Sequence, residues 1–392
     1  MGSRDSKGVV LEALSLGRPP RIPVSVWGGG MWTARMMGTT LLDLSRDGEQ
    51  MAKALQMAHE RIPFDIVFVG SGYPNALYGA LGGKLRFEGI SAPKLEGPVL
   101  KDLAGAKDLP LEKIHQDPIL RAVRTAAASL KRSLEGRAFL AIVANGPLTF
   151  AGQLLGVNQL MMALLDSPDR VQELLEVSRK AICLFLEPLL EEGVVDGAAL
   201  ADPTASGDLI SRKTFQEFAL PGISQIAQWI REREAYLFLH ICGNTADRLD
   251  LVAGSGIHCF SLDHKVDLAS ARVTLQGKTC LAGNVDPVEI MLRGKEREVE
   301  EKAKETLGWR GGVPSLPALL SKISKKEGVK EEKVRGGDRR RSVVGVRKLF
   351  CQIGVRKLGY AGASVARFLG VTTSLVNRYA SSEEVDNLDQ YL

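Results

Sequence analysis

The sequence predicts a TIM-type (β/α)8 barrel that lacks its eighth strand, followed by a small all-α helix-turn-helix domain. A short apolar segment, a polar loop and a helical pattern recur seven times before residue 312. Such alternation indicates a parallel sheet, and seven repeats favour a barrel over an open doubly wound sheet, which stays an alternative. Polar residues follow each apolar segment, at the strand ends where barrel active sites form. Beyond residue 315 the chain becomes basic and helical.

The expected strands are short, apolar and closed by glycine or polar residues. With their polar ends they cover residues 21–27, 64–69, 139–144, 197–201, 235–242, 256–264 and 278–287. Helical spacing is expected at 9–16, 41–61, 119–134, 150–165, 168–191, 211–232 and 288–307. No apolar strand follows the last of these helices. The expected domains are therefore a barrel over 1–312 and a basic helical domain over 315–392.

Composition limits the class and location of the protein. A chain of 392 residues is long enough for two domains. It contains no apolar run of 18 residues, so no membrane span is expected, and its first residues lack the apolar core of a signal peptide. Five cysteines without a secreted pattern favour a reducing cytoplasm.

Charge is divided unevenly along the chain. Residues 315–392 contain 15 Lys and Arg against 8 Asp and Glu, a net charge of +7, while residues 1–314 carry −2. This asymmetry predicts that the C-terminal region meets a polyanion.

The same region has the spacing of a helix-turn-helix. Val365, Ala366 and Leu369 form the apolar face of one helix, Gly370 makes the turn, and Thr372 caps a second helix. The second helix would present four residues to a DNA major groove: Thr373, Ser374, Asn377 and Arg378. Further cations are expected to neutralise phosphates: Arg339, Arg340, Arg341, Arg347, Lys348, Arg356 and Lys357. The alternative is a helical hairpin for protein contact.

A candidate metal site lies at the end of the strand over 235–242. His240 and Cys242 are two residues apart, so in an extended strand they share a face. An imidazole and a thiol form half of a soft nitrogen and sulfur site, for which zinc is the natural ion. The alternative is a buried cysteine beside a hydrogen-bonded histidine.

These residues support a resemblance to a known family. Residues 8–312 resemble the uroporphyrinogen decarboxylase superfamily of TIM barrels, through Arg21-Ile-Pro-Val, Asp202-Pro203 and Gly283-Asn284-Val-Asp286-Pro287. His240-Ile-Cys242-Gly-Asn resembles the zinc motif of its corrinoid-dependent methyltransferase branch, which includes the methylcobamide:coenzyme M methyltransferases. Decarboxylation of a tetrapyrrole is not expected. The loop after residue 27 holds a single arginine, and Gly70-Ser71 stands where decarboxylases have their catalytic aspartate.

The resemblance implies a zinc enzyme that transfers a methyl group from a methylcorrinoid protein to a small thiol acceptor. His240 and Cys242 would bind zinc, and Asp202, Asn284 and Asp286 would be catalytic. Asp202 and Asp286 would otherwise orient the histidine. The family's third zinc ligand comes from the eighth strand, which is missing here. Cys280 is expected in the core, and Asp202, Asp263 and His264 are other candidates for this ligand. Tyr73, Asn75 and Asn145 are expected to line the substrate pocket, although each could instead form a hydrogen bond within its own loop.

Residues 315–392 are similar to the DNA-binding domain of the bacterial chromosomal replication initiator. Two other hypotheses stay open beside a methyltransferase with a DNA-binding tail. One is a barrel without activity, a sensor or relic, in a DNA-binding regulatory protein. The other is an accidental fusion whose truncated barrel exposes strand edges and is unstable.

Overall fold

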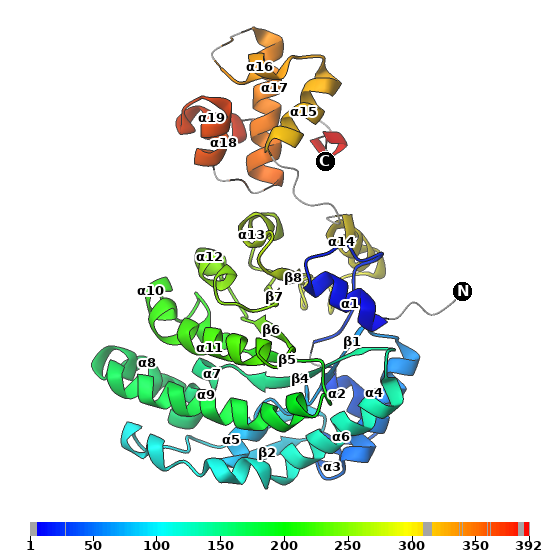
Figure 1. Ribbon diagram of the computed structural model, residues 1–392, viewed down its shortest axis with the longest axis vertical. Helices are drawn as coiled ribbons and strands as arrows, with labels where there is room; N and C mark the ends of the chain where they lie inside the picture. The colour runs from blue at the N-terminus through cyan, green and yellow to red at the C-terminus, as the bar shows by residue number, and fades with distance from the viewer. Residues whose placement is uncertain are drawn as a thin grey trace. The chain divides into compact units, whose positions relative to one another are not determined.

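The chain divides into two compact units, shown in a computed structural model (Figure 1). The first unit comprises residues 1–266 and 277–284, and the second comprises 267–276 and 285–392. The structure describes residues 6–27, 29–308, 316–336, 338, 340–358, 360, 362–382 and 388–391. Within these ranges no single helix has the length and apolar composition of a membrane span. Only the pair α7 (Pro147–Leu155) and α8 (Val157–Asp166), bent by 106°, has them together.

A parallel sheet of six strands forms the centre of the first unit. Its neighbours follow chain order: β1 (Ile66–Val69), β4 (Phe139–Asn145), β5 (Gly197–Ala201), β6 (Tyr236–His240), β7 (Cys259–Ser261) and β8 (Cys280–Ala282). Every neighbouring pair is parallel. Sequential parallel strands joined through helices are the arrangement of a TIM-type barrel, as the sequence predicts.

The helices of the first unit precede β1 or lie between the strands along the chain. They are α1 (Ser6–Leu14), α2 (Gly30–Met36), α3 (Leu41–Leu44), α4 (Gly48–Arg61), α5 (Ala76–Ala80), α6 (Pro118–Leu134), α7 (Pro147–Leu155), α8 (Val157–Asp166), α9 (Pro168–Glu191), α10 (Arg212–Thr214), α11 (Leu220–Arg231) and α12 (Leu249–Ala253). The excursion after α5 holds the hairpin β2 (Leu85–Glu88) and β3 (Ser91–Leu95) and two short 3-10 helices, Leu103–Asp108 and Leu111–His115.

The sheet is curled rather than flat. β1 and β6 are separated by two strands, a distance of roughly 14 Å in a flat sheet. Their side chains nevertheless meet, because the rings of Phe68 and Phe238 lie 6.0 Å apart. Phe139, Cys259 and two residues of α1 complete the buried core on this concave face.

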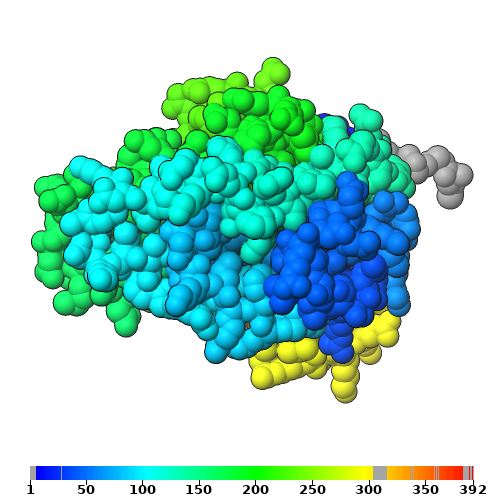
Figure 2. Space-filling model, turned by 90° about the horizontal axis from the view of Figure 1, so that it is seen from below, coloured from blue at the N-terminus to red at the C-terminus, as the bar shows by residue number. Residues whose placement is uncertain are grey.

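Helix α4 packs closely along α6. A side chain at Gly48 would place its Cβ 2.4 Å from the carbonyl oxygen of Ala122, so only glycine permits this approach. Glu49 accepts a hydrogen bond from the Ser129 hydroxyl at 2.8 Å. In the view from below, the blue N-terminal residues accordingly lie against cyan segments from beyond position 90 (Figure 2).

The expected first strand is wrong. Residues 21–27 are extended but form no ladder with the sheet. Pro23 has no amide hydrogen to donate, and the side chain of Asp65 takes the bond that a neighbouring strand would accept. Its Oδ2 accepts from the Val24 amide at 2.7 Å, and the Asp65 amide donates to the Val24 carbonyl at 2.8 Å. Arg21 donates to both carboxylate oxygens, at 2.5 and 2.6 Å.

In the described part of the chain the last strand is β8, and the lack of an eighth barrel strand stays a prediction. Residues 309–315, which join the two expected domains, lie outside the described part. The predicted helix over 41–61 is two helices, because Asp47 ends the first turn and caps α4 through the amides of Glu49 and Gln50.

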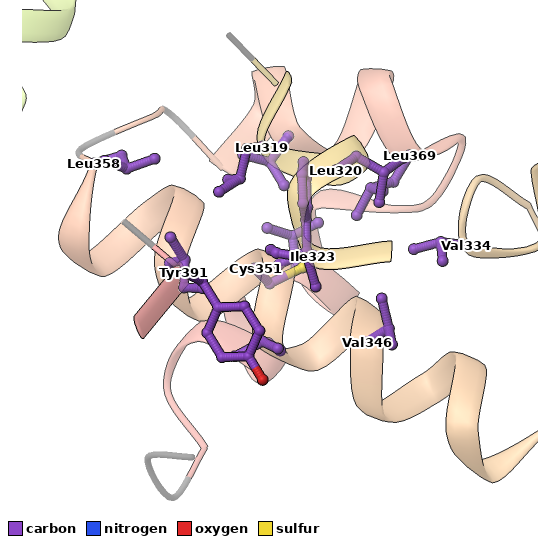
Figure 3. Packing of buried hydrophobic residues seen from close by; sticks show 14 of the residues in the cluster. Leu319, Leu320, Ile323, Val334, Val346, Cys351, Leu358, Leu369 and Tyr391 are labelled. Atoms are coloured by element: carbon purple, nitrogen blue, oxygen red, sulfur yellow. The ribbon is translucent and has the colours of Figure 1, made fainter. Parts of the chain in front are cut away.

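Helices alone build the second unit within its described residues. They are α13 (Leu268–Leu275), α14 (Glu296–Gly308), α15 (Leu316–Glu327), α16 (Glu331–Val334), α17 (Arg341–Cys351), α18 (Gly362–Leu369) and α19 (Thr373–Ala380). A π-helix, Gln352–Lys357, continues α17, and a 3-10 turn spans Leu388–Tyr391. Figure 3 shows the core, in which Leu319, Leu320 and Ile323 of α15 meet Cys351 and Leu369.

We expect the anchor of residues 21–27 to contribute measurably to stability. Arg21→Ala leaves the Asp65 carboxylate, whose side chain is 2% exposed, without its charged partner, and should lower the free energy of unfolding by about 3 kcal/mol. Urea denaturation measures this loss. Arg18→Ala, an exposed arginine nearby, is the control, and equal stability of the two variants would contradict the prediction.

The same pair also predicts an acid dependence. Burial raises the pKa of Asp65, but hydrogen bonds from Arg21, Val24 and Ser6 outweigh it and hold the pKa below its usual value. The carboxylate therefore stabilises the fold fully above about pH 4 and loses this contribution as the pH falls through its lower folded pKa. Arg21→Ala should weaken that dependence.

Candidate functional site

The candidate metal ligands come together at the end of β6. His240 is the last residue of the strand, and the intervening Ile241 is buried on the opposite side. The Nε2 atom of His240 lies 3.0 Å from the Sγ atom of Cys242, so the two side chains do share a face. His240 is half-buried and Cys242 is exposed.

The neighbouring strand fixes the orientation of the imidazole. β6 and β7 pair so that His240 lies level with Ser261. The Nδ1 atom of His240 is 3.1 Å from the Ser261 carbonyl oxygen and 3.0 Å from its hydroxyl. A carbonyl oxygen only accepts, so Nδ1 carries the hydrogen and the Nε2 lone pair faces the thiol. Sequence reasoning missed Ser261, because its role depends on strand register.

Both side chains are neutral at pH 7 in this environment. Burial lowers the pKa of His240 and outweighs the opposing effects of the Ser261 carbonyl and the Asp263 charge. Burial, with the negative charge of Asp263, raises the pKa of the Cys242 thiol. The ring of Trp27 lies 5.6 Å from the imidazole and shields it on the concave face of the sheet. A neutral imidazole with a free lone pair can bind a metal ion.

Asp263 folds the loop after β7 over the turn that follows Cys242. Its Oδ2 accepts from the Gly243 amide at 2.8 Å, and its Oδ1 accepts from the Lys265 amide at 2.9 Å. Burial raises its pKa, but these two bonds and the nearby histidines outweigh it and lower the pKa. His264 Nδ1 lies 3.0 Å from Asp263 Oδ1.

A third metal ligand is not found among the described residues, which contain no group of three His, Cys, Asp or Glu side chains that converge on one point. Cys280 is packed against the core, as expected. It pairs with Cys259 in the strand register, one layer below His240, and the residue level with His240 and Ser261 on β8 is Ala282.

Asp202 lies behind the site, fully buried. Its Oδ1 accepts from the Thr149 amide at 2.7 Å and its Oδ2 from the Leu148 amide at 3.3 Å, so it caps the N-terminus of α7. Its own amide donates to the His240 carbonyl at 2.8 Å. A Cβ at Gly146 would lie 2.4 Å from that of Asp202. The carboxylate therefore holds the start of α7, and both roles expected of Asp202, catalysis and orientation of the histidine, stay predictions.

The expected pocket residues bind loops to one another. The Tyr73 hydroxyl is buried and donates to the Leu41 carbonyl at 2.6 Å, and burial raises its pKa. Asn75 donates to the Pro93 carbonyl at 2.7 Å, and Asn145 donates to the Pro74 carbonyl at 2.8 Å. Both asparagines thus bind a loop other than their own, and their role in a substrate pocket stays a prediction.

Asn284 and Asp286 lie in different units. Asn284 donates to the Val266 carbonyl at 2.7 Å and to the Asp263 carbonyl at 3.2 Å, which ties the end of β8 to the loop after β7. Asp286 belongs to the second unit, where its Oδ1 accepts from the amides of Val288 and Glu289 and starts a turn.

In the second unit, α18 and α19 are joined by a turn in which Gly370 has a φ of +68°. The Thr372 hydroxyl caps α19 by accepting from the Leu375 amide. Val376 and Ala380 of α19 are buried. The four residues expected to contact DNA all lie on its exposed side: Thr373, Ser374, Asn377 and Arg378.

The expected phosphate contacts are partly corrected. Arg340 is exposed and pairs with Asp338, Arg341 is exposed, and Arg339 lies outside the described residues. The expectation for Arg347 is wrong, because its guanidinium is buried and donates to backbone carbonyls around α16, including that of Gly336 at 2.7 Å. It therefore holds the segment after α16 in place.

The burial of Asp202 predicts a pH dependence of stability. Burial outweighs the bonds from Thr149 and Leu148 and raises the pKa of Asp202 to about 6. Between about pH 4 and 6 the folded chain holds a proton that the unfolded chain releases, so the free energy of unfolding should fall with rising pH, by up to about 3 kcal/mol. Asp202→Asn should flatten this slope in urea denaturation.

The matched control is Asp102→Asn, an exposed aspartate that caps the 3-10 helix at Leu103–Asp108. It should leave the slope unchanged. Parallel curves for the wild type and Asp202→Asn would show that Asp202 does not bind a proton in this range.

Comparisons with known proteins place this site in a family. The model of the uroporphyrinogen decarboxylase (URO-D) family matches residues 6–314. A methylcobamide:CoM methyltransferase, MtbA, from Methanosarcina mazei is 28% identical over 274 residues, which cover 68% of this chain and 78% of the relative. A uroporphyrinogen decarboxylase from Methylobacillus flagellatus is 26% identical over 321 residues, 76% of this chain and 86% of the relative.

A solved structure has the same fold. A methyltransferase from Methanosarcina mazei aligns with a TM-score of 0.69 at 23% identity, over 78% of this chain and 90% of its own. Because the family match spans most of the sequence, the chain belongs to the uroporphyrinogen decarboxylase family.

Proposed function

We propose that the first unit is a zinc-dependent methyltransferase that takes a methyl group from a methylcorrinoid protein and gives it to a small thiol. One observation carries the proposal: Nε2 of His240 and Sγ of Cys242 lie 3.0 Å apart, with the Nε2 lone pair directed at the sulfur. The proposal is supported by relatives that are named methylcobamide:CoM methyltransferases.

His240 and Cys242 fit two positions of a zinc site. A soft nitrogen and sulfur pair is the donor set that zinc prefers, and the Ser261 carbonyl leaves Nε2 free to coordinate. Bound zinc would hold a coordinated thiol as its nucleophilic thiolate. The negative charge of Asp263, which acts on both ligands, would offset part of the charge of the ion.

Decarboxylation of a tetrapyrrole is not favoured by this geometry. The loop after β1 and the start of α2 pack backbone against backbone, since a Cβ at Gly30 would lie 2.5 Å from the Gly72 nitrogen. The Gly30 amide also donates to the Ser71 hydroxyl at 2.8 Å. This close packing and the serine stand where the decarboxylases need an aspartate.

We also propose that the second unit binds double-stranded DNA, with α19 in the major groove. The exposed side of α19 carries Thr373, Ser374, Asn377 and Arg378, while Val376 fixes the helix to the core. Asparagine and arginine pair with adenine and guanine edges. The net charge of +7 over 315–392 supports attraction to phosphates.

A barrel without activity, in a DNA-binding regulatory protein, is the second candidate. It is favoured by the lack of a third metal ligand among the described residues. Metal content separates the two candidates.

Purified protein should contain about one zinc ion per chain, by elemental analysis, because the pair at the end of β6 binds it. His240→Ala and Cys242→Ala should lose the metal and, with methylcobalamin and coenzyme M as probes, the transfer of methyl to thiol. Cys280→Ala, a cysteine in the core below the site, should retain both. Well-folded wild-type protein without zinc would exclude the zinc methyltransferase and leave the inactive barrel.

Duplexes enriched from a random pool should bind the protein with an affinity that falls as salt rises. Asn377→Ala should reduce discrimination at one base position by about 1–3 kcal/mol, measured by fluorescence anisotropy on matched and mismatched duplexes. Ser381→Ala, an exposed residue just after α19, is the control. Enrichment of no duplex would contradict DNA binding.

A further inference from the structure

The second unit has an open groove whose lining includes none of the α19 residues proposed to contact DNA bases. Its volume is about 1130 Å3, and it lies between the end of α15, the short helix α16 and the end of α18. Its lining ends at Gly370, the glycine of the turn that leads into α19. The groove therefore reaches the turn that precedes α19.

Four cations line this groove from three elements. Lys325 comes from α15, Lys330 and Arg335 flank α16, and Arg367 comes from α18. All four are exposed. The side chains of Lys325, Lys330 and Arg367 form no hydrogen bond or ion pair with the residues that the structure describes. Glu331 and Glu332 also line the groove, so the cations outnumber the carboxylates by two to one.

Contacts with Phe368 fix the orientation of the Arg335 guanidinium. Its guanidinium lies 4.5 Å from the centre of the Phe368 ring, and its Nε donates to the Phe368 carbonyl at 3.1 Å. The two terminal nitrogens donate to none of the side chains or carbonyls that the structure describes. A guanidinium fixed through Nε presents these nitrogens as a fork that matches a phosphate.

The wall of the groove also contains an unsatisfied hydroxyl. Ser324 is 5% exposed, and its Oγ has no hydrogen-bond partner in the described part of the chain. Buried hydroxyls are rarely left without a partner. This oxygen lies beneath the surface of the groove, so Ser324 marks a polar wall and does not itself contact a ligand in this conformation.

We propose that this groove binds the phosphodiester backbone of the duplex that α19 contacts. The inference rests on the proposed DNA binding and adds a second anchoring surface to it. Phosphate oxygens are acceptors that suit the exposed cations of the groove. The groove is larger than one phosphate group requires and runs to the turn before α19, which favours a strand backbone over a small phosphorylated molecule.

The test uses the full chain and the enriched duplex in anisotropy titrations over a series of KCl concentrations. The plot of log K against log salt has a negative slope, and each lost contact with a backbone phosphate reduces its magnitude by about 0.9. Lys330→Ala should therefore reduce the slope by about 0.9, and the triple variant Lys325→Ala, Lys330→Ala, Arg367→Ala by about 2.7. Lys333→Ala is the matched control, an exposed lysine of α16 outside the groove lining, and should leave the slope unchanged.

The outcomes separate this inference from the proposed function. If the triple variant binds DNA with the salt slope of the wild type, the groove does not bind the backbone, and α19 remains as the proposed DNA contact. Absence of duplex binding by the wild type would overturn both. Calorimetric titration with pyrophosphate tests the alternative that the groove binds a small phosphorylated ligand. Tight binding that the triple variant loses, with an unchanged DNA slope, would assign the groove to a small phosphorylated ligand and overturn the backbone assignment.

Discussion

The parallel register of the six strands is the constraint on which the candidate site depends. Side chains alternate between the two faces of a strand, so a shift of one residue would turn every inward side chain outward. At the observed register His240 lies level with Ser261, and Phe238 lies level with Cys259 one layer below. The aromatic layer packs the curled interior, and the layer above it carries the imidazole. The same alternation that buries the core therefore also presents the proposed metal ligands at the rim.

The sequence predicted those parts of the molecule that depend on local pattern. Apolar runs located all six strands of the parallel sheet. Residue spacing placed His240 beside Cys242, and it placed the four exposed residues on α19. Features that depend on distant partners were not accessible. Residues 21–27 have strand-like composition, but Asp65 takes their hydrogen bonds. Arg347 looked like a surface cation, yet its carbonyl partners come from a segment 9 to 14 residues earlier. Ser261 and the burial of Asp202 follow from register and from the position of α7.

The strands become shorter from β4 toward β8, the edge at which a complete barrel would have its last strand. β4 has seven residues and β5 and β6 have five, whereas β7 and β8 have three each. A short edge strand exposes few unpaired amides and carbonyls, which is one way in which proteins limit association through sheet edges. The described sheet therefore ends in short strands at this edge.

Gly146 and Asp202 occupy space that only one of them can fill. Any side chain at position 146 would overlap the aspartate, and loss of the aspartate would leave the start of α7 uncapped beside an unfilled space. Each residue thus makes the other difficult to replace alone. In evolutionary terms the two positions are epistatic: among homologues with this packing, substitutions at 146 and 202 should occur together, so that covariation between them would report a steric contact rather than shared chemistry.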